Sequence, residues 1–299
     1  LGWTYANNGA AVRYLLETTG TFQWYITGSG TAGAAITWTQ AMTLNANGYL
    51  LIGTTSASGS NYLQVNSDAL INGLTVGRGS GSGSNNTVVG NGAFSSNTGG
   101  IHAVAVGYQA LAAGGVTYYN TAVGSSALAA AINDRNTAVG ASALVSNTTG
   151  AYNAALGMQA LQGNTTASYN TGVGYQAGYS NSTGTRNTSF GYRAGYGLTT
   201  GGSNVSLGAD SMYYSSGADY NVAIGDNALL YTTGTRNVGV GMSALQTNSS
   251  GGYNVALGYG SLYSNTTAGN NTAVGYQAGY SNTTGSDSTY IGHQSGYYV

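Results

Sequence analysis

The chain contains no cysteine, no proline and no lysine, and only 4% of its 299 residues are charged. The absence of cysteine excludes a disulfide framework and thiolate metal sites. Six basic and seven acidic residues leave a net charge of −1, so no basic patch is expected to bind nucleic acid. No run of eighteen apolar residues occurs, so we expect no segment that spans a membrane. The sequence begins at Leu1 without the pattern of a signal peptide. We therefore expect that the chain is a fragment or a processed product.

Glycine is abundant instead, with 51 residues, and thirteen of them recur at a nearly fixed interval. The interval is 17 residues, apart from two intervals of 16, Gly124 to Gly140 and Gly225 to Gly241. A short fixed period predicts a solenoid or another repeat array. These anchor glycines are Gly90, Gly107, Gly124, Gly140, Gly157, Gly174, Gly191, Gly208, Gly225, Gly241, Gly258, Gly275 and Gly292.

Each repeat reads as one coil of a parallel β-solenoid or β-roll. A β-branched, small, apolar triplet such as Thr272–Val274 precedes the anchor glycine and predicts a short strand. A second apolar segment, Ala or Ser and often Leu, follows the glycine, and we expect it to form a second strand. Turns such as Ser281–Gly285 complete the coil. The density of glycine and β-branched residues opposes helix, so the predicted fold class is all-β.

The strand pattern also predicts what each face of the coil does. We expect the large residues before the anchor glycines to fill the core, and the Ala/Gly face to admit a neighbouring sheet or chain. Coils stacked in register would place Asn170, Asn187 and their equivalents in ladders that hydrogen-bond along the axis. At a strand spacing of ~4.8 Å, about thirteen coils would make a rod roughly 60 Å long.

The array is predicted to occupy residues 86–299, after a β-rich lead-in at residues 1–76 and a Gly/Ser junction at residues 77–85. Within the lead-in we expect strands at 21–27, 35–38, 62–65 and 70–76, and a hairpin at 41–54. Tyr14–Glu17 is compatible with a helical turn.

The low apolar content of each coil predicts self-association. Burial stabilises by ~25 cal/mol per Å², whereas ordering each of the seventeen residues costs about 1–2 kcal/mol. We therefore expect several chains to share a core through the small-residue face, as a homotrimer.

The repeat N-T-A-V-G-Y-Q-A-G-Y-S-N-T-T-G (Asn271–Gly285) resembles arrays in bacteriophage and prophage tail fibres. The lead-in segments 41–55 and 70–77 resemble segments of the same proteins. In that family an endosialidase-type intramolecular chaperone often follows the array. No such domain is present in this sequence, so we expect that it was removed by cleavage or that the sequence is a partial chain. A more distant resemblance is to the head repeats of trimeric autotransporter adhesins, which implies a trimeric left-handed β-roll.

We expect no enzyme activity, no metal and no cofactor. Glycan-cleaving enzymes need two carboxylates at a defined separation. In this sequence the best candidates for such a pair are Asp219 and Asp226, on neighbouring coils. We interpret them as solvated turn residues. His102 and His293 lie far apart in the array, and the Gly-rich runs lack the lysine of a phosphate loop.

The best candidate surface is a column of mainly Tyr and Arg that directly precedes the Asn column. It suits either sugar stacking and hydrogen bonding on a cell surface or a ladder that stabilises the fibre. The ladder is the favoured interpretation. A second tyrosine column (Tyr108, Tyr175, Tyr192, Tyr259 and Tyr276) is interpreted as packing between chains. The candidate ligand-binding residues, hereafter the Tyr/Arg stripe, are Tyr119, Arg135, Tyr152, Tyr169, Arg186, Tyr220, Arg236 and Tyr253.

The function expected from these features is that of a structural or receptor-binding tail-fibre shaft, located on a virion or outside the cell. Its partners would be copies of itself and a cell-surface carbohydrate or protein. One alternative is a bacterial surface adhesin or extracellular filament. A more distant one is an ice-binding solenoid, which the threonine column at Thr121, Thr137 and Thr171 suggests, although valines interrupt that column at later coils.

Overall fold

The structure, a computed structural model, describes residues 10–47, 50–52, 63–65, 69–71, 74–79, 85–113, 115 and 117–298. These residues form strands, turns and bends and no helix, which confirms the all-β prediction. The chain divides into two compact units, Leu1–Leu70 and Ile71–Val299, so the division falls shortly before residue 76. Most of the predicted Gly/Ser junction, residues 80–84, lies outside the described residues.

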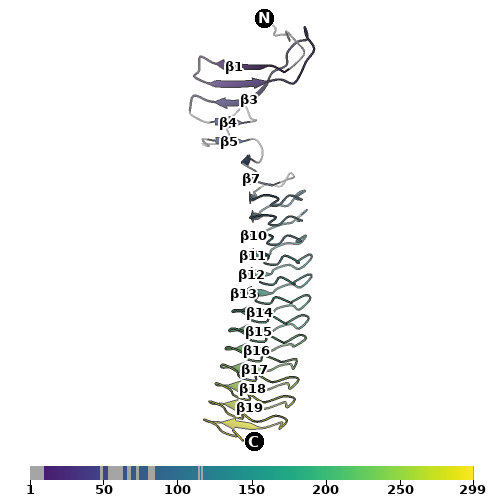
Figure 1. Cartoon of the computed structure of the whole chain (residues 1–299), viewed down its shortest axis with the longest axis vertical. Helices are drawn as coiled ribbons and strands as arrows, with labels where there is room; N and C mark the ends of the chain where they lie inside the picture. Colours follow the sequence, from purple (N-terminus) through teal and green to yellow (C-terminus); the bar gives the residue numbers. More distant parts are fainter. Residues whose placement is uncertain are drawn as a thin grey trace. The chain divides into compact units, whose positions relative to one another are not determined.

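The N-terminal unit is a five-stranded sheet in the order β1-β2-β3-β4-β5 (Figure 1). Strands β1 to β4 pair antiparallel, and β5 pairs parallel to β4. The strand expected at 21–27 is β2, and the hairpin expected at 41–54 is formed by β3 and β4. The bounds are β1 (Val12–Leu16), β2 (Phe22–Ile26), β3 (Thr39–Leu44), β4 (Leu50–Ile52) and β5 (Leu63–Val65).

The helical turn considered at Tyr14–Glu17 is absent, because most of this segment lies in β1. Tyr14 packs edge-on against Trp24 of β2 at 6.4 Å, and the Arg13 guanidinium lies 4.2 Å from the centre of the Tyr25 ring. Such cross-strand contacts stabilise sheet pairing, whereas a single helical turn gains few hydrogen bonds.

The strand expected at Ala35–Trp38 is also wrong, since the regular strand begins only at Thr39. Residues 31–34 form a tight turn in which the Ala34 N–H donates to the Thr31 carbonyl oxygen at 3.0 Å. The chain that leaves this turn joins the β2–β3 pairing only at Thr39, which pairs with Ile26.

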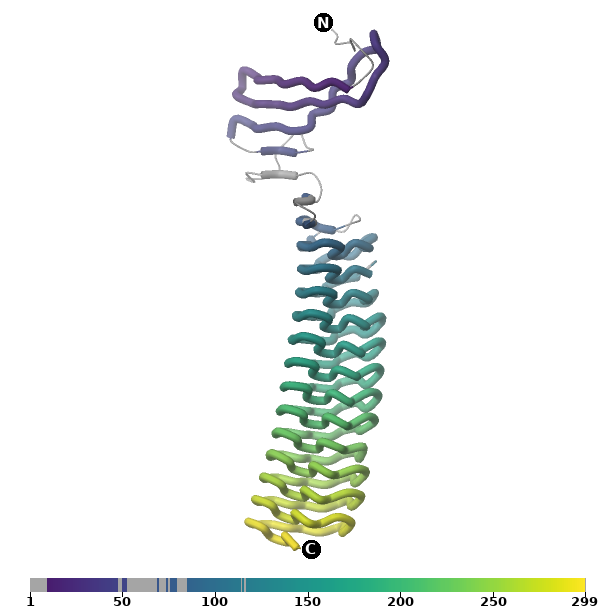
Figure 2. The backbone as a smooth tube through the Cα atoms, in the orientation of Figure 1, coloured from purple at the N-terminus to yellow at the C-terminus, as the bar shows by residue number. Residues whose placement is uncertain are grey.

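The C-terminal unit is a parallel β-solenoid of 17-residue coils, as predicted (Figures 1 and 2). Thirteen strands of three residues, β8 to β20, stack in register along it. The register is kept across both 16-residue repeats, where Thr121 pairs with Thr137 and Val222 pairs with Val238. The missing residue is therefore absorbed in the turns.

Before the coils, β7 pairs antiparallel to β8. Residues 62, 72 and 73 of the strands expected at 62–65 and 70–76 lie outside the described residues. The bounds are β6 (Ala69–Ile71), β7 (Leu74–Gly77), β8 (Thr87–Val89), β9 (Val104–Val106), β10 (Thr121–Val123), β11 (Thr137–Val139), β12 (Ala154–Leu156), β13 (Thr171–Val173), β14 (Thr188–Phe190), β15 (Val205–Leu207), β16 (Val222–Ile224), β17 (Val238–Val240), β18 (Val255–Leu257), β19 (Thr272–Val274) and β20 (Thr289–Ile291).

The two faces of the strands are the reverse of our prediction. The central residue, usually Ala, points into the coil and is fully buried, as at Ala122. The large residue before the anchor glycine points outward, and Leu156 and Phe190 remain 52% and 53% exposed. The inside of a 17-residue coil is narrow and already holds buried residues of the second apolar segment, such as Ala127 and Leu128. Only small side chains fit opposite them.

The second apolar segment is not the strand that we predicted. Its buried leucines have left-handed backbones, with φ of 50° at Leu128 and 51° at Leu144. This conformation costs an L-residue about 1–2 kcal/mol, which the burial of a leucine, worth about 1.5–3 kcal/mol, offsets. The backbone still bonds along the axis, since the Leu128 N–H donates to the Ala143 carbonyl oxygen at 3.0 Å.

Buried asparagines form hydrogen-bonded ladders along the axis, as predicted. The Oδ1 of Asn187 accepts from the N–H of Asn204 on the next coil at 3.0 Å, and its Nδ2 donates to the Gly201 carbonyl at 2.7 Å. In a second column, the Nδ2 of Asn164 donates to the Oδ1 of Asn147 at 2.9 Å. Each side chain thus joins parts of its own coil and the neighbouring coil.

The anchor glycines end the strands where two coils approach closely. Gly174 has a φ of 127°, and a Cβ placed on it would lie 2.4 Å from the carbonyl oxygen of Gly191 on the next coil. Both the backbone conformation and the contact therefore require glycine.

We predict that Gly174→Ala destabilises the solenoid by about 3 kcal/mol or more, because it combines a strained φ with a backbone clash. Thermal unfolding followed by circular dichroism measures this effect. Gly217→Ala is the control: its φ is ordinary and the nearest atom to its Cβ would be the Thr200 Oγ1 at 3.7 Å. We expect it to change stability by less than about 0.5 kcal/mol, and equal effects of the two variants would contradict the prediction.

Candidate functional site

The residues of the Tyr/Arg stripe lie on the surface, one per coil, directly before the buried asparagines. Each has a left-handed backbone, with φ of 59° at Arg135 and 60° at Tyr152. This turn directs the asparagine inward and leaves the preceding side chain outside. Tyr119, Tyr169, Tyr220 and Tyr253 are 53%, 54%, 59% and 58% exposed.

The structure brings the stripe together as two stacked runs. In the first, the rings of Tyr152 and Tyr169 are parallel at 5.1 Å, and Arg135 lies 5.6 Å from the Tyr119 ring and 5.4 Å from the Tyr152 ring. The run begins with His102 stacked on Tyr119 at 5.1 Å and ends with Arg186, which lies 5.9 Å from the Tyr169 ring.

The second run contains Tyr220, Arg236 and Tyr253. Arg236 lies 5.2 Å from the Tyr220 ring and 5.4 Å from the Tyr253 ring, and its Nη1 donates to the Tyr253 hydroxyl at 3.2 Å. Ser203 separates the two runs.

This stacking decides what the stripe can offer to a ligand. Rings about 5 Å apart cover one another's faces, as at Tyr152 and Tyr169, so no sugar ring fits between them. The stripe presents ring edges and hydroxyl groups along its length, and open faces only where a run ends. Its geometry suits a stabilising ladder better than a continuous sugar-stacking surface.

The outward face of the strands forms a second surface, hereafter the outer strip. It consists of the residues three and one positions before each anchor glycine and the residue directly after it, which includes the second tyrosine column. Tyr175 and Tyr192 stack here at 5.5 Å, and Leu257 is 46% exposed. Among these positions only Asp226 is charged.

A third tyrosine column, which is not among the predicted surface columns, lies five residues after the anchor glycines. Tyr179, Tyr196 and Tyr213 stack at 4.9 and 4.8 Å, and Tyr263, Tyr280 and Tyr297 stack at 4.9 and 5.0 Å. The signal was present as tyrosine at 17-residue intervals. It was overlooked because this position also holds Ala, Val, Leu and Gln in other coils.

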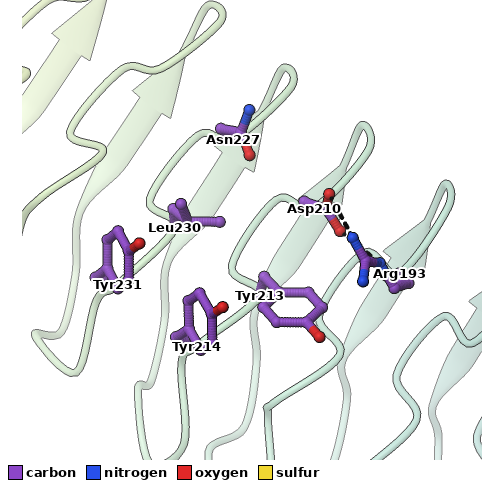
Figure 3. A pocket seen from close by; sticks show the side chains of 7 residues that line it. All are labelled: Arg193, Asp210, Tyr213, Tyr214, Asn227, Leu230 and Tyr231. Carbon is purple, nitrogen blue, oxygen red and sulfur yellow. Dashed lines mark hydrogen bonds and ion pairs between the residues drawn. The ribbon is translucent and has the colours of Figure 1, made fainter.

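A hollow of about 190 Å³ lies beside this third column (Figure 3). Side chains from three successive coils line it, and on one side Arg193 and Asp210 form a bidentate ion pair with Nε–Oδ1 and Nη2–Oδ2 distances of 2.9 and 3.0 Å. The lining residues are Arg193, Asp210, Tyr213, Tyr214, Asn227, Leu230 and Tyr231.

The arginine of this pair is held on several sides. Its guanidinium lies 4.7 Å from both the Tyr192 and the Tyr213 rings. The hydrogen bond to Asp210 raises the pKa of Arg193, so the group is a permanent cation whose charge Asp210 neutralises.

The acidic residues considered as a catalytic pair occupy different positions of the coil. The Oδ1 of Asp219 accepts a hydrogen bond from the Gly202 N–H at 2.7 Å and so belongs to a turn. Asp226 is exposed in the outer strip. In the described part of the chain, no group of three or more His, Asp or Glu side chains could hold a metal ion, and no helix is long and apolar enough to cross a membrane.

No protein-family model, no curated protein and no solved structure matches this chain.

Alkaline pH tests the third tyrosine column. Burial, followed by the proximity of other tyrosines, raises the pKa of Tyr196 and Tyr280. As pH rises past about 10, the unfolded chain loses these protons before the folded chain does, so the stability present below pH 10 falls. We expect the melting temperature to fall above pH 10 and to fall less steeply in a Tyr196→Phe/Tyr280→Phe variant. An unchanged slope in the variant would contradict this assignment.

Proposed function

We propose that the chain is the shaft of a homotrimeric fibre of the phage tail-fibre type, which attaches to a cell-surface glycan or protein. The observation that carries the proposal is the outer strip, a nearly uncharged surface rich in Val, Leu, Ile, Tyr and Thr that continues over the stacked coils of β8 to β20. Surface patches of this extent mark interaction sites.

The size of the outer strip suits a stable interface. Thirteen strands at ~4.8 Å and five residues at ~3.3 Å each give a surface of about 60 by 16 Å, or roughly 1,000 Å². Stable interfaces bury about 800 Å² on each partner. Leu207, Leu257 and Ile291 are 43%, 46% and 69% exposed on this surface, so its burial would remove much apolar area from water.

Other copies of the same chain are the partners that fit best. The strip repeats once per coil, so a second copy has the same spacing and its rows can match over the full length. Its near lack of charge resembles the core of a protein interface. The association predicted through the small-residue face is excluded, because those alanines are buried within their own coil. The outer strip takes that role in the present proposal.

The receptor-binding part of the proposal rests on the surfaces outside the strip. Exposed Tyr and Arg side chains recur there with polar turns between them, and these residue types dominate recognition surfaces. A surface adhesin or extracellular filament built from the same coils remains the alternative, and it differs in forming open-ended assemblies.

Light scattering of the native protein tests the assembly, and we expect the mass of three chains. A Phe190→Asp/Leu207→Asp variant places two charges in the strip and is expected to shift the particle to a monomer, because burying unpaired charges is costly. Circular dichroism is expected to show that the coils remain folded. Tyr192 and its neighbours would then become accessible to chemical modification.

Thr183→Asp, an exposed turn residue in the same region, is the matched control and should stay trimeric. A wild-type monomer would contradict the trimer, and open-ended polymers would favour the filament alternative. Binding of the labelled trimer to bacterial cells, measured by flow cytometry, tests attachment separately; a trimer that binds none of a broad panel of cells would be a shaft without receptor binding.

A further inference from the structure

The hollow lined by Arg193, Asp210 and Tyr214 lies where one aromatic ladder ends and another begins. Tyr179, Tyr196 and Tyr213 form the first ladder, and Tyr214 and Tyr231 stack at 5.0 Å in a ladder shifted by one residue. The change occurs within a single coil, where the rings of Tyr213 and Tyr214 meet edge-on at 4.6 Å and 82°.

The end of the first ladder creates the space. The coil after Tyr213 carries Leu230 at the equivalent position, and Leu230 is only 8% exposed. A smaller, buried side chain therefore replaces the next ring, while Tyr214 and Tyr231 stand beside it, 57% and 46% exposed. Figure 3 shows Leu230 beside Tyr231 and close to Tyr214 among the residues that line the hollow. Aromatic surface is thus available here that is covered by stacked neighbours elsewhere in the column.

The opposite side of the hollow is polar. The Oδ2 of Asp210 accepts a hydrogen bond from the Nη2 of Arg193 and keeps a further lone pair that can accept a hydroxyl proton. The Oδ1 is buried beside the Nε of Arg193. The half-buried side-chain amide of Asn227, on the next coil, makes no hydrogen bond within the described residues. An amide can both donate and accept, so it can bond to a hydroxyl in either direction.

We propose that this hollow binds one ring of a neutral pyranose sugar, with an apolar ring face against the tyrosines and hydroxyl groups on Asp210 and Asn227. Ligand sites combine apolar walls with a few placed polar groups in this way. The volume of about 190 Å³ suits a single ring. This inference rests on the proposed receptor-binding function and names the ligand class and the site for it.

The charge arrangement favours a neutral sugar over an acidic one. A carboxylated sugar needs a cation whose charge is not already compensated, whereas Asp210 neutralises Arg193 through contacts to its Nε and Nη2. An incoming carboxylate would also meet the Asp210 carboxylate at short range, and like charges repel. The ion pair therefore orients Asp210 as a hydroxyl acceptor.

Saturation-transfer NMR on the intact protein tests the site, with the methyl glycosides of glucose, galactose, mannose and N-acetylglucosamine as neutral probes and N-acetylneuraminic acid as the acidic probe. We expect at least one neutral glycoside to bind with millimolar affinity, as is usual for a single ring. Tyr214→Ala and Asn227→Ala are each expected to weaken that binding about tenfold.

Two matched variants control for changes in the fold. Ile132→Ala removes a large apolar side chain with the same exposed fraction as Tyr214, 57%, from the loop before β11, outside the Tyr/Arg stripe, the outer strip and the hollow. Asn270→Ala replaces an exposed asparagine whose left-handed backbone, φ 59°, resembles that of Asn227, φ 54°. Both are expected to bind the glycoside as the wild type does. Binding lost only in the two hollow variants supports the proposal.

Several outcomes would overturn it: no neutral glycoside binds, the hollow variants bind as well as the controls, or only the acidic probe binds. Cell attachment separates this failure from that of the proposed function. A trimer that binds cells equally well with and without Tyr214→Ala keeps the receptor-binding function and refutes this site.

Discussion

Each coil of the solenoid has backbone N–H and carbonyl groups that point along the axis and find no partner within the same coil. The next coil must supply their hydrogen-bond partners, which requires the coils to stack in register. Three-residue strands supply part of this pairing, and the asparagine ladders supply much of the rest, as Asn187 does for Asn204. Because a buried polar group without a partner is costly, slippage of one coil against another would break many bonds at once. The requirement for register is what places like residues above one another.

The same requirement explains the residues that look unsuited to their positions. Close approach of the coils allows only glycine at Gly174, and the need for axial bonding holds Leu128 in a left-handed conformation. It also brings the rings of Tyr152 and Tyr169 into contact at 5.1 Å. The aromatic ladders are thus consequences of a period of seventeen residues, and their surface roles are limited by the spacing that creates them.

The period was sufficient to predict the fold class, the parallel stacking, the asparagine ladders and the position of the Tyr/Arg stripe. It was not sufficient to predict which face of each strand is buried, because alternation alone does not reveal the width of the coil. Ala122 inside and Leu156 outside follow from the space that Leu128 already occupies. The second apolar segment was mistaken for a strand, since its left-handed leucines are decided by inter-coil bonding and not by local preference.

The hollow beside Tyr214 could not be found by reading columns, because it arises where the columns change. Tyr213 and Tyr214 fall on one coil, and the change from Tyr213 to Leu230 matters only once the coils are stacked. The proposed sugar site therefore lies at an irregularity of the repeat and not in one of its regular columns.

The two 16-residue repeats show how the length of such a protein can evolve. They pair with their neighbours in the same register as the 17-residue repeats. The strand of any coil can therefore pair with the strand of any other coil above or below it. Duplication or loss of a whole coil in the gene would preserve every type of contact. The length of a solenoid built on this plan would then change in steps of ~4.8 Å. An irregular patch on one coil would be duplicated or lost together with that coil.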